Sequence, residues 1–220
     1  RGLIDHVPEL AIADVLRSTE GGMGQSIMTK DTPPSETAKF TLLPVAKVLL
    51  PDGSREVVPG SGEVGMVAQC GMVPLGYYKD PEKSAKTFKE IDGTRYAFIG
   101  DMATIDDDGT INLLGRGSNC INTGGEKVFP EEVEEALKLH PDVADALVFG
   151  LEDERFGNRV AGVVSLEQGG TAEAGDILEA TRKLLASYKL PKDLLVVPVV
   201  PRAPNGKADY KSAKALMADS

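Results

Sequence analysis

The most informative segment of the chain is residues 112–134, which read N-L-L-G-R-G-S-N-C-I-N-T-G-G-E-K-V-F-P-E-E-V-E. The run from Ile111 to Leu114 predicts a strand, which Gly115-Arg116-Gly117 ends. After a polar, glycine-rich segment, Pro130 and the acids that follow it are typical of the first turn of a helix. This stretch therefore predicts a strand, a polar connection and then a helix.

The composition is that of an ordinary globular protein. The 220 residues are 41% hydrophobic and 26% charged, which suits one large domain or two small ones. A net charge of −10 argues against nucleic acid or an anionic membrane as the main partner. No apolar run reaches the length of about 18 residues that a membrane-spanning helix needs, so we expect no integral membrane segment.

The few cysteines and histidines bear on the compartment and on metals. Cys70 and Cys120 lack the spacing of a disulfide framework, which fits a reducing cytoplasm. His6 and His140 have no neighbouring metal-ligand pattern, so we expect no zinc site. Peripheral membrane attachment and a homo-oligomer both remain open.

Regular structure can be predicted in both halves of the chain. Before residue 115, short apolar and β-branched runs bounded by turn residues predict several antiparallel strands. After it, the hydrophobic periodicity predicts an α+β arrangement in the order α-β-β-α-β. The elements expected there are a helix over 130–140, strands over 143–149 and 160–166, a helix over 176–190 and a strand over 194–200.

Several polar residues have a plain local interpretation. Thr19 and Glu20, followed by two glycines, are typical of a turn. Asp101 ends an apolar strand after a glycine, as a turn-forming residue or as a carboxylate that accepts hydroxyl groups. Lys127 follows a Gly-Gly turn and Lys207 follows Pro-Asn-Gly, and taken alone each lysine is ordinary surface charge.

The order of these motifs resembles that of the acyl-adenylate-forming enzymes, a superfamily that includes acyl-CoA synthetases, luciferases and peptide-synthetase adenylation domains. Their hinge pattern, G-R-x-x-x-x-I/V-K/N-x-x-G-x-x-I/V-x-P-x-E-I/V-E, matches residues 115–134. Within this match, the segment C-I-N-T-G-G-E-K-V-F-P-E-E-V-E most resembles that of actinobacterial fatty-acid and steroid-side-chain acyl-CoA synthetases.

The resemblance implies an α/β and α+β protein with two parts. Residues 1–115 are expected to be the β-rich, C-terminal part of the large catalytic domain, and residues 116–220 the small mobile C-terminal domain. The hinge between them is expected near residues 116–118. The Ser/Thr/Gly-rich phosphate loop of the family is absent from the sequence, so we expect this piece alone to have no ligase activity.

The resemblance also implies roles for residues of the first part. In the family, the threonine matched by Thr19 contacts the nucleotide phosphate and the glutamate matched by Glu20 supports Mg²⁺. Asp101 matches the aspartate that accepts the ribose hydroxyls. Leu16 and Arg17 stand where the family has Tyr and Gly, and that tyrosine is the residue that stacks on adenine.

Roles in the second part follow from the same resemblance. Arg116 is expected to contact ribose and phosphate, and Ser118 occupies the pivot position, where the family carries Asp or Lys. Gly124 and Gly125 match the loop that shapes the pantetheine tunnel for thioester formation. Lys127 stands where related enzymes carry a basic residue near the nucleotide phosphate.

Lys207 matches the lysine that ends the family's P-R-T-P-x-G-K motif, with Ala203 in place of the threonine. In the family, this lysine touches the acyl carboxylate and the α-phosphate during adenylation. A point positive charge fixed by a rigid turn suits the charge that builds on a pentacoordinate phosphorus.

The function expected from the resemblance is ATP-dependent acyl-CoA synthesis from a fatty or related hydrophobic carboxylic acid. ATP, Mg²⁺ and coenzyme A are the implied cofactor and co-substrates, with no nucleic-acid partner. Two alternatives remain open: an acyl-AMP ligase that loads a carrier protein, and a non-catalytic module that binds nucleotide or a partner.

Overall fold

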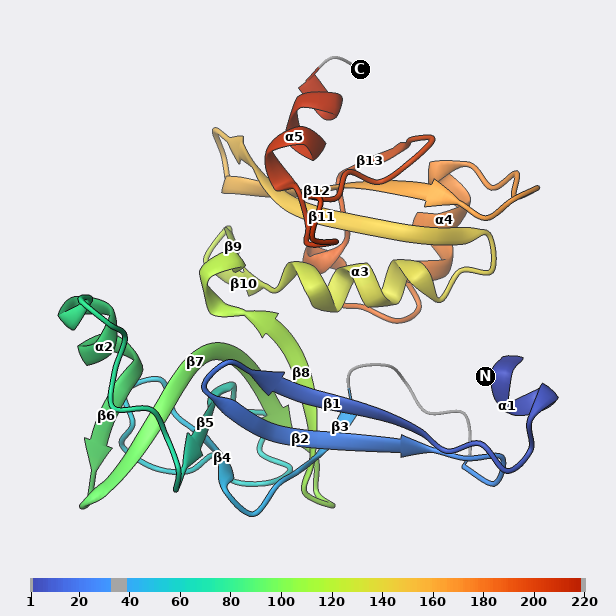
Figure 1. The fold of residues 1–220 in the computed structure, drawn as a ribbon. Helices are drawn as coiled ribbons and strands as arrows, with labels where there is room; N and C mark the ends of the chain where they lie inside the picture. The colour runs from blue at the N-terminus through green and yellow to red at the C-terminus, as the bar shows by residue number, and fades with distance from the viewer. Residues whose placement is uncertain (1, 33–38, 219–220) are drawn as a thin grey trace. The chain divides into compact units, whose positions relative to one another are not determined.

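The structure, a computed structural model, describes residues 2–32 and 39–218. The chain divides into two compact units, Arg1–Leu114 and Gly115–Ser220. Figure 1 shows a strand-rich first unit and a second unit in which helices cover a sheet. Each unit has its own hydrophobic core.

The first unit is built on an eight-stranded sheet with the order β1-β2-β3-β8-β7-β5-β4, and β6 pairs with β7. Antiparallel pairs such as β1–β2 and β5–β7 make up this sheet. Its elements are α1 (Gly2–His6), β1 (Ile12–Ser18), β2 (Gly21–Met28), β3 (Lys39–Leu42), β4 (Ala46–Leu49), β5 (Gly65–Cys70), α2 (Pro81–Thr87), β6 (Phe88–Ile91), β7 (Thr94–Ile105) and β8 (Thr110–Arg116).

Both faces of this sheet carry apolar side chains. Successive residues of a strand point to opposite faces, and in β5 the fully buried Val67 and Ala68 belong to different hydrophobic clusters. Val67 packs in the cluster of Met23 and Ile111, whereas Ala68 packs in that of Phe98. The strands are therefore held from both sides.

Strand β7 contains a bulge. Met66 of β5 pairs with Met102 and Ala68 pairs with Phe98, so two steps along β5 match four steps along β7. Ile99, Gly100 and Asp101 consequently lie opposite the single residue Val67. Gly100 has a φ of +94°, a conformation that side-chain-bearing residues rarely adopt, so a glycine suits this bend.

The second unit has a five-stranded sheet with the order β10-β9-β12-β11, and β13 pairs in parallel with β12. Helices α3 and α4 cover one face of this sheet and α5 covers the other (Figure 1). Its elements are η1 (Gly117–Asn119), β9 (Ile121–Thr123), β10 (Glu126–Val128), α3 (Pro130–Lys138), β11 (Val143–Asp153), β12 (Gly157–Leu166), α4 (Ala174–Thr181), η2 (Ser187–Lys189), β13 (Asp193–Val196) and α5 (Tyr210–Ala218).

Helix α3 follows directly from its sequence. Pro130 is at the first helical position, where its missing N–H and fixed φ cost nothing. Glu131 and Glu132 lie in the first turn, where negative charge suits the helix dipole. Val133 and Leu137, four residues apart, are fully buried against the sheet.

Several predicted elements need correction. The helix expected over 176–190 ends at Thr181, whose hydroxyl donates to the Ile177 carbonyl, and a separate 3₁₀ turn follows at 187–189. Leu184, within the range of that expected helix, is 54% exposed. The strand expected over 194–200 stops at Val196, two residues before a proline that cannot donate to a sheet ladder. Helix α5 was not predicted.

No helix within residues 2–32 and 39–218 is long and apolar enough to cross a membrane.

Candidate functional site

The turn between β1 and β2 presents a carboxylate that accepts two side-chain hydrogen bonds. Thr19 and Glu20 are the two turn residues, with Ser18 paired to Gly21. The Tyr77 hydroxyl donates to Glu20 Oε1, and Thr19 Oγ1 donates to Glu20 Oε2 at 3.0 Å. The turn predicted from sequence is therefore present, and the residues that the resemblance selected make it up.

The Glu20 carboxylate stays ionised at neutral pH. Burial raises its pKa, but the hydrogen bonds from Tyr77, Ser18 and Thr19 outweigh that effect and lower the pKa to about 2. Among the described residues, no group of three or more His, Cys, Asp and Glu side chains could hold a metal ion. A single ionised carboxylate fits Mg²⁺, which is commonly bound by one or two carboxylates together with substrate phosphates and water.

Asp101 lies on the β7 bulge and does not end its strand as expected, because β7 continues to Ile105. Bulges bend a strand and leave residues outside the regular pairing, and they are common beside active sites. The residue is half-buried and has interaction partners in the structure. A half-buried carboxylate at a bend can accept hydroxyl groups, the role that the resemblance implies.

The β9–β10 hairpin presents bare backbone. Its two turn residues, Gly124 and Gly125, have φ values of +58° and +91°, and positive φ at both positions is typical of a type I′ turn. Lys127 lies on β10, opposite Asn122, and is exposed. Gly124, Gly125 and Lys127 therefore share one hairpin.

A basic and aromatic cluster beside this hairpin was missed at the sequence level. The Gly124 N–H donates to the Phe156 carbonyl at 2.9 Å, and a Cβ at Gly124 would lie 3.1 Å from Phe156 Cδ1. The Arg155 guanidinium carbon lies 5.0 Å and the Lys192 ammonium 4.5 Å from the centre of the Phe156 ring. Two cations around an aromatic face suit a ligand that carries both a ring and phosphates.

Part of that cluster has a sequence signal. Asp153 Oδ1 accepts the backbone N–H groups of Arg155 and Phe156 at 3.0 and 2.9 Å, which shapes the turn between β11 and β12. An aspartate followed two residues later by a basic–aromatic pair is visible in D-E-R-F-G, whereas Lys192 comes from a distant segment. Only the fold brings the second cation to Phe156.

Lys207 lies on a second, separate hairpin. Arg202 and Ala208 form a β-bridge at its base, and the Ala203 N–H donates to the Lys207 carbonyl at 2.8 Å. The Lys207 side chain is exposed. The Arg202 guanidinium donates two hydrogen bonds, of 3.0 and 2.6 Å, to the Asp145 carboxylate, which anchors the hairpin to β11. The lysine is therefore presented on a short, fixed support.

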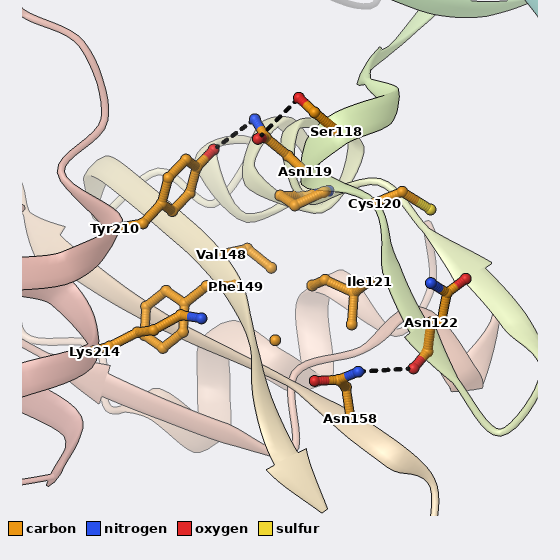
Figure 2. Close-up of a pocket in the computed structure, with 12 residues that line it drawn as sticks. Ser118, Asn119, Cys120, Ile121, Asn122, Val148, Phe149, Asn158, Tyr210 and Lys214 are labelled. Atoms are coloured by element: carbon orange, nitrogen blue, oxygen red, sulfur yellow. Dashed lines mark hydrogen bonds between the residues drawn. The ribbon is translucent and has the colours of Figure 1, made fainter.

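Ser118, the last of the predicted hinge residues, borders a pocket of about 290 Å³ within the second unit (Figure 2). Residues 118–122 form one side, 148–150 of β11 another, and Tyr210 and Lys214 of α5 a third. Asn158 of β12 donates to the Asn122 carbonyl at 3.3 Å. Of the residues selected by resemblance in this unit, Ser118 lines the pocket, whereas Gly124, Gly125 and Lys127 do not.

A buried glutamate lies in α3, on the side of the helix that faces the sheet. Glu134 is 8% exposed, and its carboxylate accepts the Val148 N–H at 2.8 Å. Burial raises its pKa to about 7, against the opposing effect of that hydrogen bond. This carboxylate is therefore partly neutral at physiological pH, unlike Glu20.

A family model places the second unit among known domains. Residues 132–207 match the model described as the AMP-binding enzyme C-terminal domain. Lys207 is the last residue of this match.

Curated proteins and solved structures match most of the chain. It is 45% identical over 214 residues to the 3-oxocholest-4-en-26-oate–CoA ligase of Rhodococcus rhodochrous. It is 46% identical over 212 residues to the medium/long-chain-fatty-acid–CoA/3-oxocholest-4-en-26-oate–CoA ligase of Mycolicibacterium smegmatis. Each match covers 96% of this chain but 38% of the relative. The structure of ATP-bound MatB from Rhodopseudomonas palustris is similar with a TM-score of 0.73 and 28% identity, over 94% of this chain and 40% of that one.

Proposed function

We propose that this chain, which belongs to the AMP-binding, adenylate-forming enzyme family as a counterpart of the C-terminal part of such enzymes, acts as part of an ATP-dependent acyl-CoA synthetase. The first unit then supplies the end of the large catalytic domain, and the second is its small mobile domain. Because the chain spans 38% of these relatives, the remaining substrate contacts of such an enzyme lie outside it.

The proposed reaction begins with adenylation. A carboxylate oxygen of the acid attacks the α-phosphorus of ATP, the bond from that phosphorus to pyrophosphate breaks, and an acyl-adenylate forms. Lys207 offsets the negative charge that develops on the α-phosphate and orients the carboxylate. Thr19 contacts the phosphate, Asp101 accepts the ribose hydroxyls, and Arg116 and Lys127 add positive charge near the nucleotide.

Glu20 is the residue of this chain that would hold Mg²⁺. Its carboxylate is fixed by Tyr77 and Thr19 and ionised down to about pH 2, and a hard cation prefers such an oxygen ligand. When bound, the cation neutralises phosphate charge. The turn itself keeps the carboxylate oriented while the substrate enters.

The second proposed step is thioester formation. The thiol sulfur of coenzyme A attacks the acyl carbonyl carbon, and the bond between that carbon and the AMP oxygen breaks. The thiol proton is released to solvent. We assign the switch between steps to rotation at residues 116–118, which withdraws Lys207 and brings up the Gly124–Gly125 turn. Arg155, Phe156 and Lys192, beside that turn, suit the nucleotide end of coenzyme A.

The relatives suggest a substrate class. Their names specify medium and long-chain fatty acids and a steroid-side-chain acid, so we propose a hydrophobic carboxylic acid for this protein. A cytoplasmic location suits an enzyme that consumes ATP and coenzyme A, and both cysteines are free.

The observation that carries the proposal is the fixed presentation of Lys207 on its anchored hairpin. In the gene product that carries this chain, Lys207→Ala should lower ATP–pyrophosphate exchange by about 10²–10³, as loss of a charge-stabilising donor does. Thioester formation from supplied acyl-adenylate should be retained. Lys211→Ala, an exposed lysine four residues away, is the matched control and should leave both reactions unchanged.

Two results would redirect the proposal. Unchanged pyrophosphate exchange in Lys207→Ala would remove this lysine from the mechanism and favour a binding module. Transfer of the acyl group to a carrier-protein thiol but not to coenzyme A would favour an acyl-AMP ligase. The basic cluster at Phe156 favours coenzyme A, because a phosphate-bearing nucleotide needs such charges.

A further inference from the structure

Glu131, in the first turn of α3, contacts the segment where the chain enters the second unit. The Arg116 N–H donates to Glu131 Oε1 at 3.4 Å, and the Asn119 side-chain amide donates to the same oxygen at 3.1 Å. The other oxygen lies against Gly115, where a Cβ would be only 2.2 Å away. One carboxylate thus touches three residues of 115–119.

The contacts with Glu131 are specific to the present backbone conformation. Gly115 has a φ of +125°, which favours glycine, and its lack of a side chain lets the carboxylate approach. A rotation about the backbone at 116–118 would turn the Arg116 N–H and the Asn119 amide away from one fixed acceptor. Losing both donors would leave a half-buried carboxylate without these hydrogen bonds.

Asn119 extends this contact to a second helix. Its amide also lies 3.5 Å from the Tyr210 hydroxyl of α5, and burial raises the pKa of that phenol, so it stays neutral (Figure 2). Asn119 is therefore held between α3 and α5, at the edge of the pocket bordered by residues 118–122.

Two oxygens of the first turn of α3 lack a donor. Within the part of the chain that the structure describes, Glu131 Oε2 and Glu132 Oε2 are buried and accept no hydrogen bond, and the Glu131 oxygen is the one that lies against Gly115. A buried oxygen without a donor costs free energy in the present conformation. Rotation of the adjacent backbone could supply a donor, because it would move N–H groups that lie next to this oxygen.

We propose that Glu131 is a positioning residue that holds the hinge at residues 115–119 in one of its two conformations. This inference rests on the proposed function, which supplies the two conformations. Glu131 contacts no reacting atom in the proposed reaction. It biases the ratio of the adenylating to the thioester-forming state through the Arg116 and Asn119 donors.

The first test measures the hinge without measuring activity. We would follow backbone hydrogen exchange of peptides spanning 112–120 in the gene product that carries this chain. Glu131→Ala should speed exchange there by about tenfold, because the Arg116 N–H loses its acceptor. Glu131→Gln should restore most of the protection, since its amide oxygen can still accept. Unchanged exchange in Glu131→Ala would overturn the proposal.

The second test separates positioning from stability. The ratio of pyrophosphate exchange to thioester formation from supplied acyl-adenylate should change by about tenfold in Glu131→Ala and by less than about threefold in Glu131→Gln, where a tenfold change is about 1.4 kcal/mol. Glu132→Gln is the matched control, because it removes a neighbouring carboxylate that pairs with Lys189, outside the hinge, at 2.6 Å. It should lower thermal stability and leave the ratio unchanged.

The outcomes distinguish this inference from the proposed function. An equal change of the ratio in Glu132→Gln and Glu131→Ala would mean that stability, not the hinge contact, sets the ratio, and would overturn the inference. If the wild-type protein catalysed neither reaction, the proposed function would fail. The exchange rates would still show whether Glu131 holds residues 115–119.

Discussion

The β1–β2 turn and the β9–β10 turn both have two residues, but Thr19 and Glu20 fill the first with polar side chains whereas Gly124 and Gly125 leave the second bare. The first turn depends on a distant contact, from Tyr77, to fix its carboxylate. The second depends on positive φ at both glycines, so its shape is set within the turn itself. One turn therefore supplies charge, and the other supplies close access to backbone.

The largest expected effect removes the charge from the first turn. Glu20→Gln keeps an acceptor for the Tyr77 hydroxyl but loses the ionised oxygen that would hold Mg²⁺. We expect ATP–pyrophosphate exchange to fall by about 10²–10³. Asp14→Asn, on the exposed side of β1, is the control and should keep its rate. An unchanged rate of pyrophosphate exchange in Glu20→Gln would mean that this turn has only a structural role.

Glu134 is a buried glutamate, in contrast to Glu20, which lies in a turn. The pKa of Glu134 rises from its ordinary 4.5 to about 7, so the folded protein binds the proton more tightly than the unfolded chain. Stability should therefore fall as pH rises from about 4.5 to about 7. Glu134→Gln keeps an acceptor for Val148 and should be more stable at pH 8, by on the order of 2 kcal/mol.

Urea unfolding at pH 5 and pH 8 checks the effect of Glu134. The free energies of unfolding of the wild-type and Glu134→Gln proteins should differ more at pH 8 than at pH 5, because Glu134 is largely ionised only at the higher pH. Glu135→Gln, which removes a carboxylate paired with Lys138 on the same helix, is the control for helix charge. A Glu134→Gln protein that is less stable at pH 8 would show that its charge is stabilising after all.

The smallest expected effect tests whether the second turn must be bare. Gly125→Ala places a methyl group at a φ of +91° with nothing within 4 Å, so it adds backbone strain of about 1 kcal/mol without a clash. Gly169→Ala has the same strain, at a φ of +88° and also with open space, in another turn of the unit. Thioester formation should slow severalfold only in Gly125→Ala. Equal rates of thioester formation in the two variants would mean that this reaction does not need a turn free of side chains.

Local signals predicted some of this architecture well. Pro130 with its acidic neighbours predicted the start of α3, and Thr19-Glu20-Gly21-Gly22 predicted a turn, because both depend on residues adjacent in sequence. The short strand at Lys39–Leu42 and the next at Ala46–Leu49 are separated at Pro44, because a proline has no N–H to donate to a sheet ladder.

Other features depend on contacts that no local pattern contains. The Tyr77 hydroxyl donates to Glu20, a residue 57 positions away, and no local pattern links the two. Glu131 occupies a variable position of the hinge pattern, so the pattern gave no reason to expect its contacts with Arg116 and Asn119. The roles of Thr19, Glu20, Asp101, Lys127 and Lys207 remain predictions, since they depend on substrates.

The bulge in β7 has a consequence for how this sequence can change in length. The strand gains two residues between Phe98 and Met102 relative to β5, and an even number preserves the alternation of faces. Ile99 before the bend and Ala103 after it therefore pack in the same cluster. A single insertion or deletion here would exchange the faces of every later residue of the strand, whereas a paired one would not, so viable length variants at Asp101 should differ by twos.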